Sequence, residues 1–274
     1  MTGVAELLKV LELERVDERH LVGDSLRMGR SSVVFGGQLL AQSIVAGAAV
    51  DPTKDVISIH IIFARAADFD SPLEFEVDVM AAGRAFASSS VTISQSGKVR
   101  ARSLVLLAAP EVDLIGHEVD APDVARPAVG PPSGHGLEGW EIGVVDEVDV
   151  RDPDAIGPAE LAVWTRFVGA PSDPTISRAL LGFASDGFLI GAAMRPHPGI
   201  GQSMAHVSIS TTVNAHTLSF HQPFDAGDWM LLDQQVPWAG RGRSHGQAQV
   251  FDVDGRLVAS FSQENMIRAF AGGA

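Results

Sequence analysis

The chain carries the same order of segments twice, and this internal repeat constrains its fold more than any other feature. In the first half, an apolar segment at residues 33–50 precedes a long strand-like run at residues 56–80. In the second half, an apolar segment at residues 177–194 precedes a similar run at residues 216–236. Two further strand-like segments follow in each half, each introduced by a turn that contains Gly. The order predicts two similar folded units.

Matching residues keep a nearly constant spacing between the two copies. The spacing is 157 residues for three pairs, namely Phe63 with Phe220, Asp68 with Asp225, and Gly83 with Gly240. Gly97 and Gly255 are 158 residues apart, and the apolar segments align Gln38 with Asp186 at a spacing of 148. Chance explains one such match but hardly the whole series in order. The spacing therefore indicates a duplication.

The pattern within each copy predicts its fold. The apolar segment is apolar on nearly every side of a helix, which is typical of a buried helix. The other segments read as strands joined by short turns. A sheet curled around one buried helix is the hotdog arrangement, and a second unit can pair the sheet edges that one unit leaves open. We therefore predict an α+β fold, a double hotdog in which each half is an antiparallel sheet wrapped around a central helix.

The segment between the copies predicts the domain boundaries. Residues 110–139 are rich in Pro, Gly and Asp and show no sustained periodicity, which is typical of a linker. Residues 140–168 return to strand-like patterning. We therefore predict an N-terminal hotdog domain at residues 1–109, a linker at 110–139, and a C-terminal hotdog domain at 140–274.

Charge and hydropathy narrow the possible partners. The formal net charge is -14, from 20 Lys and Arg against 34 Asp and Glu, and a negative surface repels the phosphates of nucleic acids. The longest apolar stretch, residues 39–50, falls well short of the roughly 20 residues that span a bilayer. Residues 1–20 lack the apolar core of a signal peptide. We expect a cytoplasmic protein that neither binds nucleic acid nor inserts into a membrane.

The sequence gives little support to a metal or nucleotide site. Cys is absent, which excludes thiolate ligands and disulfides. Five of the 9 histidines lie between His197 and His245, but His216 and His221 fall on opposite sides of a continuous strand, and no HExxH motif accompanies them. The chain also lacks GxGxxG and GxxxxGK[ST] motifs, and residues 201–205 lack the second Gly of a nucleophile elbow. We expect neither a metal nor a cofactor.

Asp186 and Gln263 are polar residues in apolar surroundings. Asp186 lies within the apolar segment SRALLGFASDGFLIGAAM, and a buried carboxylate needs partners or a raised pKa. A partly exposed Asp at the start of a helix would explain it equally well. Gln263 follows Leu257, Ala259 and Phe261 on one side of a strand, so it faces the predicted core. Its amide is expected to have partners there, with a backbone bulge as the simpler explanation.

The repeat makes these two residues stand out further. The matching positions in the first half are occupied by Gln38 and Val105. The copies therefore share a scaffold but not these polar groups. A single active site on a duplicated scaffold would show this asymmetry, with the carboxylate of Asp186 and the amide of Gln263 placed around a water molecule.

Several segments, in order, resemble a known family. The first half contains VFGGQLLAQSIVA and SIHIIFARAADFDSPLEFEVDV, and the second contains LLGFASDGFLIGAAM, HTLSFHQPF and GRLVASFSQENMIR. Taken together, the VFGGQ, ASD, FHxPF and SQE segments resemble the bacterial thioesterase II and peroxisomal acyl-CoA thioesterase family over most of the chain. The resemblance implies a double hotdog that hydrolyses acyl-CoA to free acid and CoA without a metal or cofactor.

The resemblance also implies a site in which an Asp, a Ser or Thr, and a Gln position the attacking water. The Asp of the ASD segment falls on Asp186, and the Gln of the SQE segment falls on Gln263. Family members usually read Ser/Thr-x-Asp-His ahead of FHxPF, whereas residues 211–216 here read TTVNAH. An ungapped count reaches Val213, and a shift of one residue reaches Thr212. We take Thr212 as the third catalytic residue.

These residues define an expected mechanism. Asp186 acts as general base, and Gln263 with a neighbouring hydroxyl holds the water. Backbone N–H groups of Gly36 and Gly37, or their equivalents in the second half, stabilise the oxyanion. Arg84 and Arg241, which lie near predicted turns, are expected to contact the phosphates of the acyl-CoA substrate. The expected substrate is a medium- to long-chain fatty acyl-CoA, and the family suggests a homo-oligomer, either a dimer or a tetramer.

Two other functions remain open from the sequence. The altered threonine region is compatible with a non-catalytic module that binds acyl-CoA or acyl carriers. A hotdog enoyl-CoA hydratase is a second alternative, although it would need an Asp followed five residues later by a His. Here His197 follows Asp186 by eleven residues.

Overall fold

The computed structural model describes residues 2–29, 31–126 and 137–270. Within these ranges the strands form one sheet of 12 strands in the order β1-β2-β4-β5-β6-β3-β9-β12-β11-β10-β8-β7, and the ladders between neighbours are antiparallel. The first six strands of this order come from the first half of the chain and the last six from the second half. This arrangement confirms the predicted α+β fold.

Each half consists of six strands and its own helices. The first half comprises α1 (Val4–Leu11), β1 (Glu14–Arg15), β2 (His20–Gly23), α2 (Gly36–Ala48), β3 (Asp55–Phe63), β4 (Leu73–Ala82), β5 (Phe86–Gln95) and β6 (Lys98–Ala108). The second half comprises β7 (Trp140–Val144), β8 (Glu160–Phe167), α3 (Pro174–Ser185), α4 (Leu189–Met194), β9 (Ile209–Phe220), β10 (Met230–Gly240), β11 (Arg243–Phe251) and β12 (Leu257–Ala269), with short 3-10 helices at Val145–Glu147 and Gln202–Met204.

The two halves join through β3 and β9, and this seam carries the symmetry of the duplication. His60 on β3 pairs with Thr217 on β9, and these residues are 157 positions apart, the spacing between the copies. Equivalent residues that pair in an antiparallel ladder lie on a local twofold axis. His60 Nδ1 and Thr217 Oγ1 are 2.8 Å apart, so a hydrogen bond crosses the seam there. Each half thus closes an edge of the other, as predicted.

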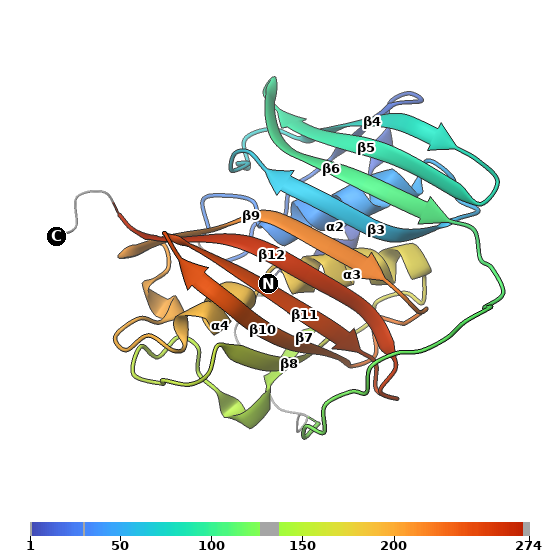
Figure 1. The fold of residues 1–274 in the computed structure, drawn as a ribbon. Helices are drawn as coiled ribbons and strands as arrows, with labels where there is room; N and C mark the ends of the chain where they lie inside the picture. The colour runs from blue at the N-terminus through green and yellow to red at the C-terminus, as the bar shows by residue number, and fades with distance from the viewer. Residues whose placement is uncertain (1, 30, 127–136, 271–274) are drawn as a thin grey trace.

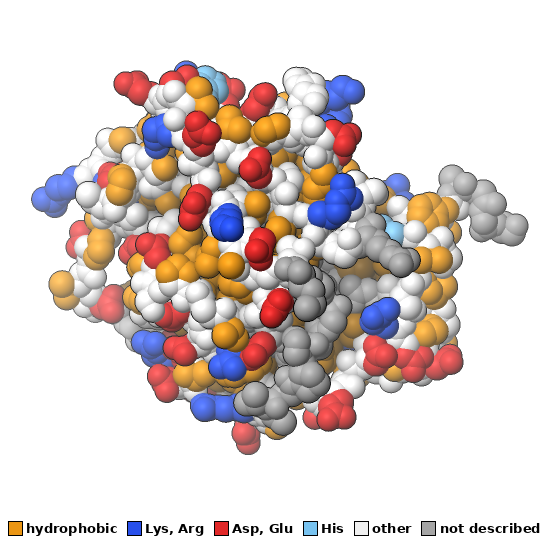
Figure 2. Space-filling model, turned by 180° about the vertical axis from the view of Figure 1, so that it is seen from behind, with side chains coloured by type: hydrophobic (Ala, Val, Ile, Leu, Met, Phe, Trp, Pro, Cys, Tyr) orange, Lys and Arg blue, Asp and Glu red, His pale blue; other side chains and the backbone are white. Residues whose placement is uncertain are grey.

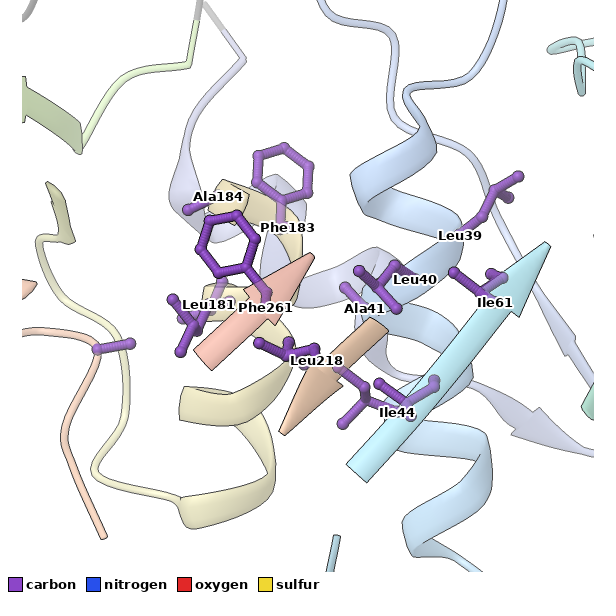
Figure 3. Close-up of a cluster of buried hydrophobic side chains, with 14 of the residues drawn as sticks. Leu39, Leu40, Ala41, Ile44, Ile61, Leu181, Phe183, Ala184, Leu218 and Phe261 are labelled. Atoms are coloured by element: carbon purple, nitrogen blue, oxygen red, sulfur yellow. The ribbon is translucent and has the colours of Figure 1, made fainter. Parts of the chain in front are cut away.

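The core lies between the sheet and the central helices. Figure 1 shows α2 and α3 next to one another behind the continuous sheet. They approach closely because Gly182 of α3 has no side chain: a Cβ there would lie 2.8 Å from Ile44 Cδ1 of α2. Figure 3 shows the same region, where Leu40, Ile44 and Leu218 meet at the boundary between the halves. Burial on all sides accounts for the apolar composition of both predicted helical segments.

The helix of the second half is interrupted, whereas its sequence predicts one segment. Helix α3 ends at Ser185, Asp186 forms its C-cap, and α4 begins at Leu189. Asp and Gly both have low helix propensity, so the Asp186–Gly187 pair is a natural place for the break. The stretch Pro174–Met194 is long and apolar enough to cross a membrane by composition, but 83% of its apolar window is buried inside the fold. The break places a carboxylate inside the core.

The segment between the halves lies against the second half. Residues 109–126 contain no helix or strand, and residues 127–136 of the predicted linker lie outside the described residues. Trp164 Nε1 donates a hydrogen bond to the Ala125 carbonyl, and the Leu257 N–H donates to Glu118 Oε2. The predicted domain boundaries stay a prediction.

On the face shown in Figure 2, Lys and Arg side chains are dispersed among Asp and Glu.

Candidate active site

Asp186 lies where the central helices of the two halves meet. It is the C-cap of α3, and only 9% of the residue is exposed. The first turn of α2 lies against its carboxyl group: a Cβ on Gly36 would be 2.7 Å from Asp186 Oδ2, and a Cβ on Gly37 would be 2.4 Å from the Phe183 carbonyl oxygen. Only glycine allows this approach. The N-terminus of α2, with its partial positive charge, therefore stabilises the ionised carboxylate.

The surroundings of Asp186 act in opposite directions on its pKa. Burial raises the pKa of Asp186 above its ordinary value because the ionised form loses its hydration. A hydrogen bond from the Gly37 N–H opposes this effect but is smaller. The net shift is upward. A carboxylate with a raised pKa is a stronger base than an exposed Asp, which suits it to accept a proton.

Gln263 reaches the same place from β12. It lies on the inward face of the strand, as the alternation predicts, and is 1% exposed. Its Nε2 donates a hydrogen bond of 2.9 Å to the Ser185 carbonyl oxygen and lies 3.0 Å from His216 Nδ1. The amide thus connects β12 to the end of α3 and to β9. The bulge of the β9–β12 ladder lies one residue further along, between Glu264 and Asn265.

Two further residues of this cluster escaped the sequence analysis. His216 on β9 is fully buried, with Nε2 at 3.2 Å from Ser185 Oγ and Nδ1 at 3.7 Å from Asp186 Oδ1. The last distance is too long for a hydrogen bond. From the sequence, His216 was weighed only as a possible metal ligand. Its position in alternation with Leu218 and Phe220 already placed it on the core face of the strand.

Two oxygens of this cluster lack a hydrogen-bond donor. Asp186 Oδ1 and Gln263 Oε1 are both buried, and neither accepts a hydrogen bond from the part of the chain that the structure describes. A buried acceptor without a donor is costly. Both atoms belong to side chains that meet at His216. A water molecule has two O–H donors, so one water bound between these oxygens would satisfy both.

The structure does not bring Thr212 into this cluster. Thr212 is exposed on β9, pairs with Met266, and directs its hydroxyl to the Val213 carbonyl. Val213, the alternative from the ungapped count, is buried but has no polar side-chain atom. The hydroxyl that lies within the cluster belongs to Ser185. The placement therefore gives no support to Thr212 as the third catalytic residue.

The predicted phosphate contacts lie in different halves. Arg84 occupies the β4–β5 turn and Arg241 the β10–β11 turn, where both are exposed. They are equivalent positions of the repeat, so a single site is not expected to use both in the same way. Their role stays a prediction.

Among the described residues, no group of three or more His, Asp or Glu is placed to hold a metal ion.

Two cavities in the described part of the chain lie away from Asp186. The larger, of about 460 Å³, is a polar trough lined by strands β9 to β12, with Thr217, Asp233 and Gln249 among its residues. The smaller, of about 130 Å³, lies near Asp55, Arg178 and His221. Neither is lined by Asp186, Gln263 or His216. Because Asp186 is only 9% exposed, a substrate that reaches it must displace neighbouring side chains.

Comparison with known proteins gives a consistent result over most of the chain. Residues 25–108 match the model of an acyl-CoA thioesterase N-terminal domain, and residues 118–267 match that of an acyl-CoA thioesterase C-terminal domain. Acyl-CoA thioesterase 2 of Haemophilus influenzae is 27% identical over 282 residues, covering 96% of both chains. Acyl-coenzyme A thioesterase 8 of Mus musculus is 28% identical over 286 residues, covering 94% of this chain and 88% of its own.

Solved structures share the fold. An acyl-CoA thioesterase II from Mycobacterium marinum superposes with a TM-score of 0.82 at 26% identity, covering 98% of this chain and 99% of its own. A hot dog fold protein from Alicyclobacillus acidocaldarius superposes with a TM-score of 0.77 at 17% identity, covering 99% of this chain and 100% of its own. Both likenesses extend over the two halves together, which confirms the double-hotdog prediction.

Proposed function

This chain belongs to the acyl-CoA thioesterase family and is a thioester hydrolase, and we propose that it hydrolyses medium- to long-chain fatty acyl-CoA by Asp186-assisted attack of water. One observation carries the proposed mechanism. Asp186 Oδ1 and Gln263 Oε1 are buried acceptors without a donor among the described residues. A water held between them would have one proton directed at a carboxylate of raised pKa.

The proposed reaction has two steps. In the first, Asp186 accepts a proton from the water while the water oxygen forms a bond to the thioester carbonyl carbon. In the second, the tetrahedral intermediate collapses, the C–S bond breaks, and the proton held by Asp186 passes to the leaving thiolate. The products are the fatty acid and CoA. A thioester carbonyl is already electrophilic, so positioning and one base are sufficient.

The first turn of α2 supplies the proposed oxyanion contact. The first N–H groups of a helix have no partner within the helix. The Gly37 N–H donates to the Asp186 carboxyl group, which leaves the Gly36 N–H as the better candidate for the substrate oxygen. Both amides lie at the positive end of the helix dipole. A developing negative charge on the carbonyl oxygen would therefore be stabilised at this helix end.

Aromatic rings near Asp186 offer apolar contacts for the acyl chain of the proposed substrate. Phe63 Cε1 lies 3.6 Å from the Cβ position of Gly36, and the rings of Phe35 and Phe183 meet edge to face at 5.1 Å. An acyl chain that displaces such side chains would gain apolar contact over its length. We therefore place the acyl chain beside Phe35, Phe63 and Phe183.

Thiol release tests the proposed function. The purified protein is assayed with acyl-CoA substrates from acetyl-CoA to palmitoyl-CoA, and we expect kcat/KM to rise toward the longer chains. Equal rates along the series would contradict the chain-length proposal. An enoyl-CoA is included because loss of its absorbance without thiol release would indicate a hydratase. Binding without either signal would indicate an acyl-CoA binding module.

The same proposal includes location and assembly. We propose a cytoplasmic protein that forms homodimers or homotetramers. Exposed apolar side chains on neighbouring strands β3 and β6 support self-association, namely Ile62, Leu104 and Leu106. Light scattering of the purified protein measures its mass in solution, and fractionation of cells that express it measures its location.

A further inference from the structure

The hydrogen bonds around His216 form a chain in which each group donates to the next, from Gln263 through His216 and Ser185 to the Gly182 carbonyl oxygen. Gln263 Nε2 carries two hydrogens, and one of them is donated to the Ser185 carbonyl oxygen. The other points to His216 Nδ1 at 3.0 Å, so Nδ1 must accept. His216 Nε2 then carries the hydrogen and donates to Ser185 Oγ, and Ser185 donates to the Gly182 carbonyl oxygen. Every donor in this chain of bonds has an acceptor.

This direction fixes the state of His216. It requires a neutral ring with its hydrogen on Nε2. A ring with a hydrogen on Nδ1 would face the Gln263 NH2 group with a second donor at 3.0 Å. The amide would then have to turn over, which would break its bond to Ser185 and move Oε1 out of its present orientation.

The ring has little freedom to leave this position. His216 is fully buried in β9, and its neighbours across the sheet are Gln263 on β12 and Ile61 on β3. The ring of Phe261 lies 5.4 Å away at an interplanar angle of 35°. The nearest carboxyl group is that of Asp186, with Oδ1 at 3.7 Å from Nδ1. His216 therefore holds a fixed acceptor toward the Gln263 amide.

We propose that His216 is a positioning residue that keeps the Gln263 amide turned so that Oε1 faces the attacking water. Its Nδ1 lone pair accepts from Gln263, and Ser185 holds the hydrogen on Nε2. The inference rests on the proposed function, because Gln263 Oε1 matters only if a water reacts there. His216 and Ser185 thus provide the hydrogen bonds that orient the site, whereas Thr212 is exposed and does not reach it.

The tautomer can be measured without any assay of activity. In protein labelled with ¹⁵N-histidine, a neutral ring with its hydrogen on Nε2 gives a pyridine-like Nδ1 resonance and a pyrrole-like Nε2 resonance. We expect this pattern for His216 at neutral pH, identified by its loss in a His216→Asn variant. The opposite tautomer, or a protonated ring, would overturn the proposal even if the enzyme were active.

Substitutions at His216 separate positioning from packing. Asn places an amide oxygen near the site of Nδ1, whereas Gln reaches the site of Nε2 and Phe fills the space with no polar atom. We expect His216→Asn to keep kcat within about tenfold of wild type, and His216→Gln and His216→Phe to lose about 100-fold, as for misplaced catalytic groups. KM is expected to change little in all three variants.

A packing role predicts the reverse order, since Phe keeps the ring volume and Asn leaves a cavity. Retention of activity by His216→Phe above His216→Asn would therefore overturn the proposal. His60→Asn, at the exposed face of the same seam, is the matched control and should keep the wild-type kcat. Each variant is first shown to melt cooperatively. If wild-type protein releases no thiol at all, the proposed function fails, while the tautomer still decides whether His216 holds Gln263.

Discussion

The carboxyl group of Asp186 lies so close to Gly36 that a Cβ on Gly36 would be 2.7 Å from Asp186 Oδ2. The two residues come from different halves of the chain, and each alone would be unremarkable at a helix end. Together they place the positive end of α2 beside a buried carboxylate.

Gly36→Ala should lower kcat by about 100-fold, because the new methyl group displaces the Asp186 carboxylate from the water and displacements of about 1 Å have effects of this size. The variant should remain folded. Steady-state thiol release with palmitoyl-CoA measures the effect. Gly116→Ala is the control, since a Cβ at Gly116 meets no atom within 4 Å. Equal kcat for the two variants would show that the contact between Gly36 and Asp186 has no role.

The activity of the enzyme should fall on the acid side. The general base must be ionised, and burial raises the pKa of Asp186 above the ordinary 3.8. As pH falls through this raised value, Asp186 becomes protonated and kcat declines. We therefore expect the acid limb of the kcat profile to lie above the pKa of an exposed Asp. A flat profile down to that pKa would show that no buried carboxylate controls the rate.

The same pKa shift predicts how stability depends on pH. A folded-state pKa above the unfolded value means that the folded protein binds a proton more tightly, so stability falls as pH rises through the folded pKa. Asp186→Asn removes the charge and should raise the melting temperature at neutral pH. The gain should shrink as pH falls through the raised pKa and vanish below 3.8, where the wild-type carboxyl is protonated in both the folded and the unfolded state. Thermal unfolding of both proteins across this pH range measures it.

An ion pair across the two halves should contribute to stability but not to catalysis. Arg178 on α3 has a side chain that is 8% exposed, and its Nη1 lies 2.8 Å from Oδ1 of Asp55 on β3. The Asp55 side chain is 44% exposed, so in a variant without its charge water can partly solvate the Arg178 guanidinium. We expect Asp55→Asn to lower the free energy of unfolding by about 1–2 kcal/mol, less than for a fully buried pair, with kcat unchanged.

Urea unfolding measures this change. Asp78→Asn serves as the control, because the pair of Asp78 with Arg19 is exposed on both sides and should be close to neutral. A loss of activity in Asp55→Asn that exceeds its loss of folded protein would contradict the separation of the two roles.

Much of the fold follows from the sequence because it depends on periodicity. The spacing of 157 residues that aligns Phe63 with Phe220 is also the spacing of the paired residues His60 and Thr217 at the seam. Strand alternation correctly placed Gln263 on the inward face. The break at Asp186 was not predicted, because a run of apolar residues does not show where a helix ends when the interior of the protein surrounds it.

The cluster around Asp186 was only partly predictable, because register decides which side chains meet. Opposite Gln263 in the β9–β12 ladder stands His216, and the bulge in that ladder shifts the residues before it, so that Thr212 falls opposite Met266. A count along the chain cannot include a bulge that exists only in the paired strands. Ser185 was missed for a different reason: its role depends on the end of α3, which brings its hydroxyl toward β9.

The central claim is that Asp186 is the base, and Asp186→Asn tests it most directly. Asn keeps the shape of the side chain but cannot accept the proton of the water. Thiol release is measured with enzyme in excess over palmitoyl-CoA, so that product release does not limit the rate. We expect hydrolysis to fall by at least about 100-fold, within the range that general base catalysis contributes, with cooperative melting retained. A folded Asp186→Asn protein that hydrolyses palmitoyl-CoA at the wild-type rate would contradict the account.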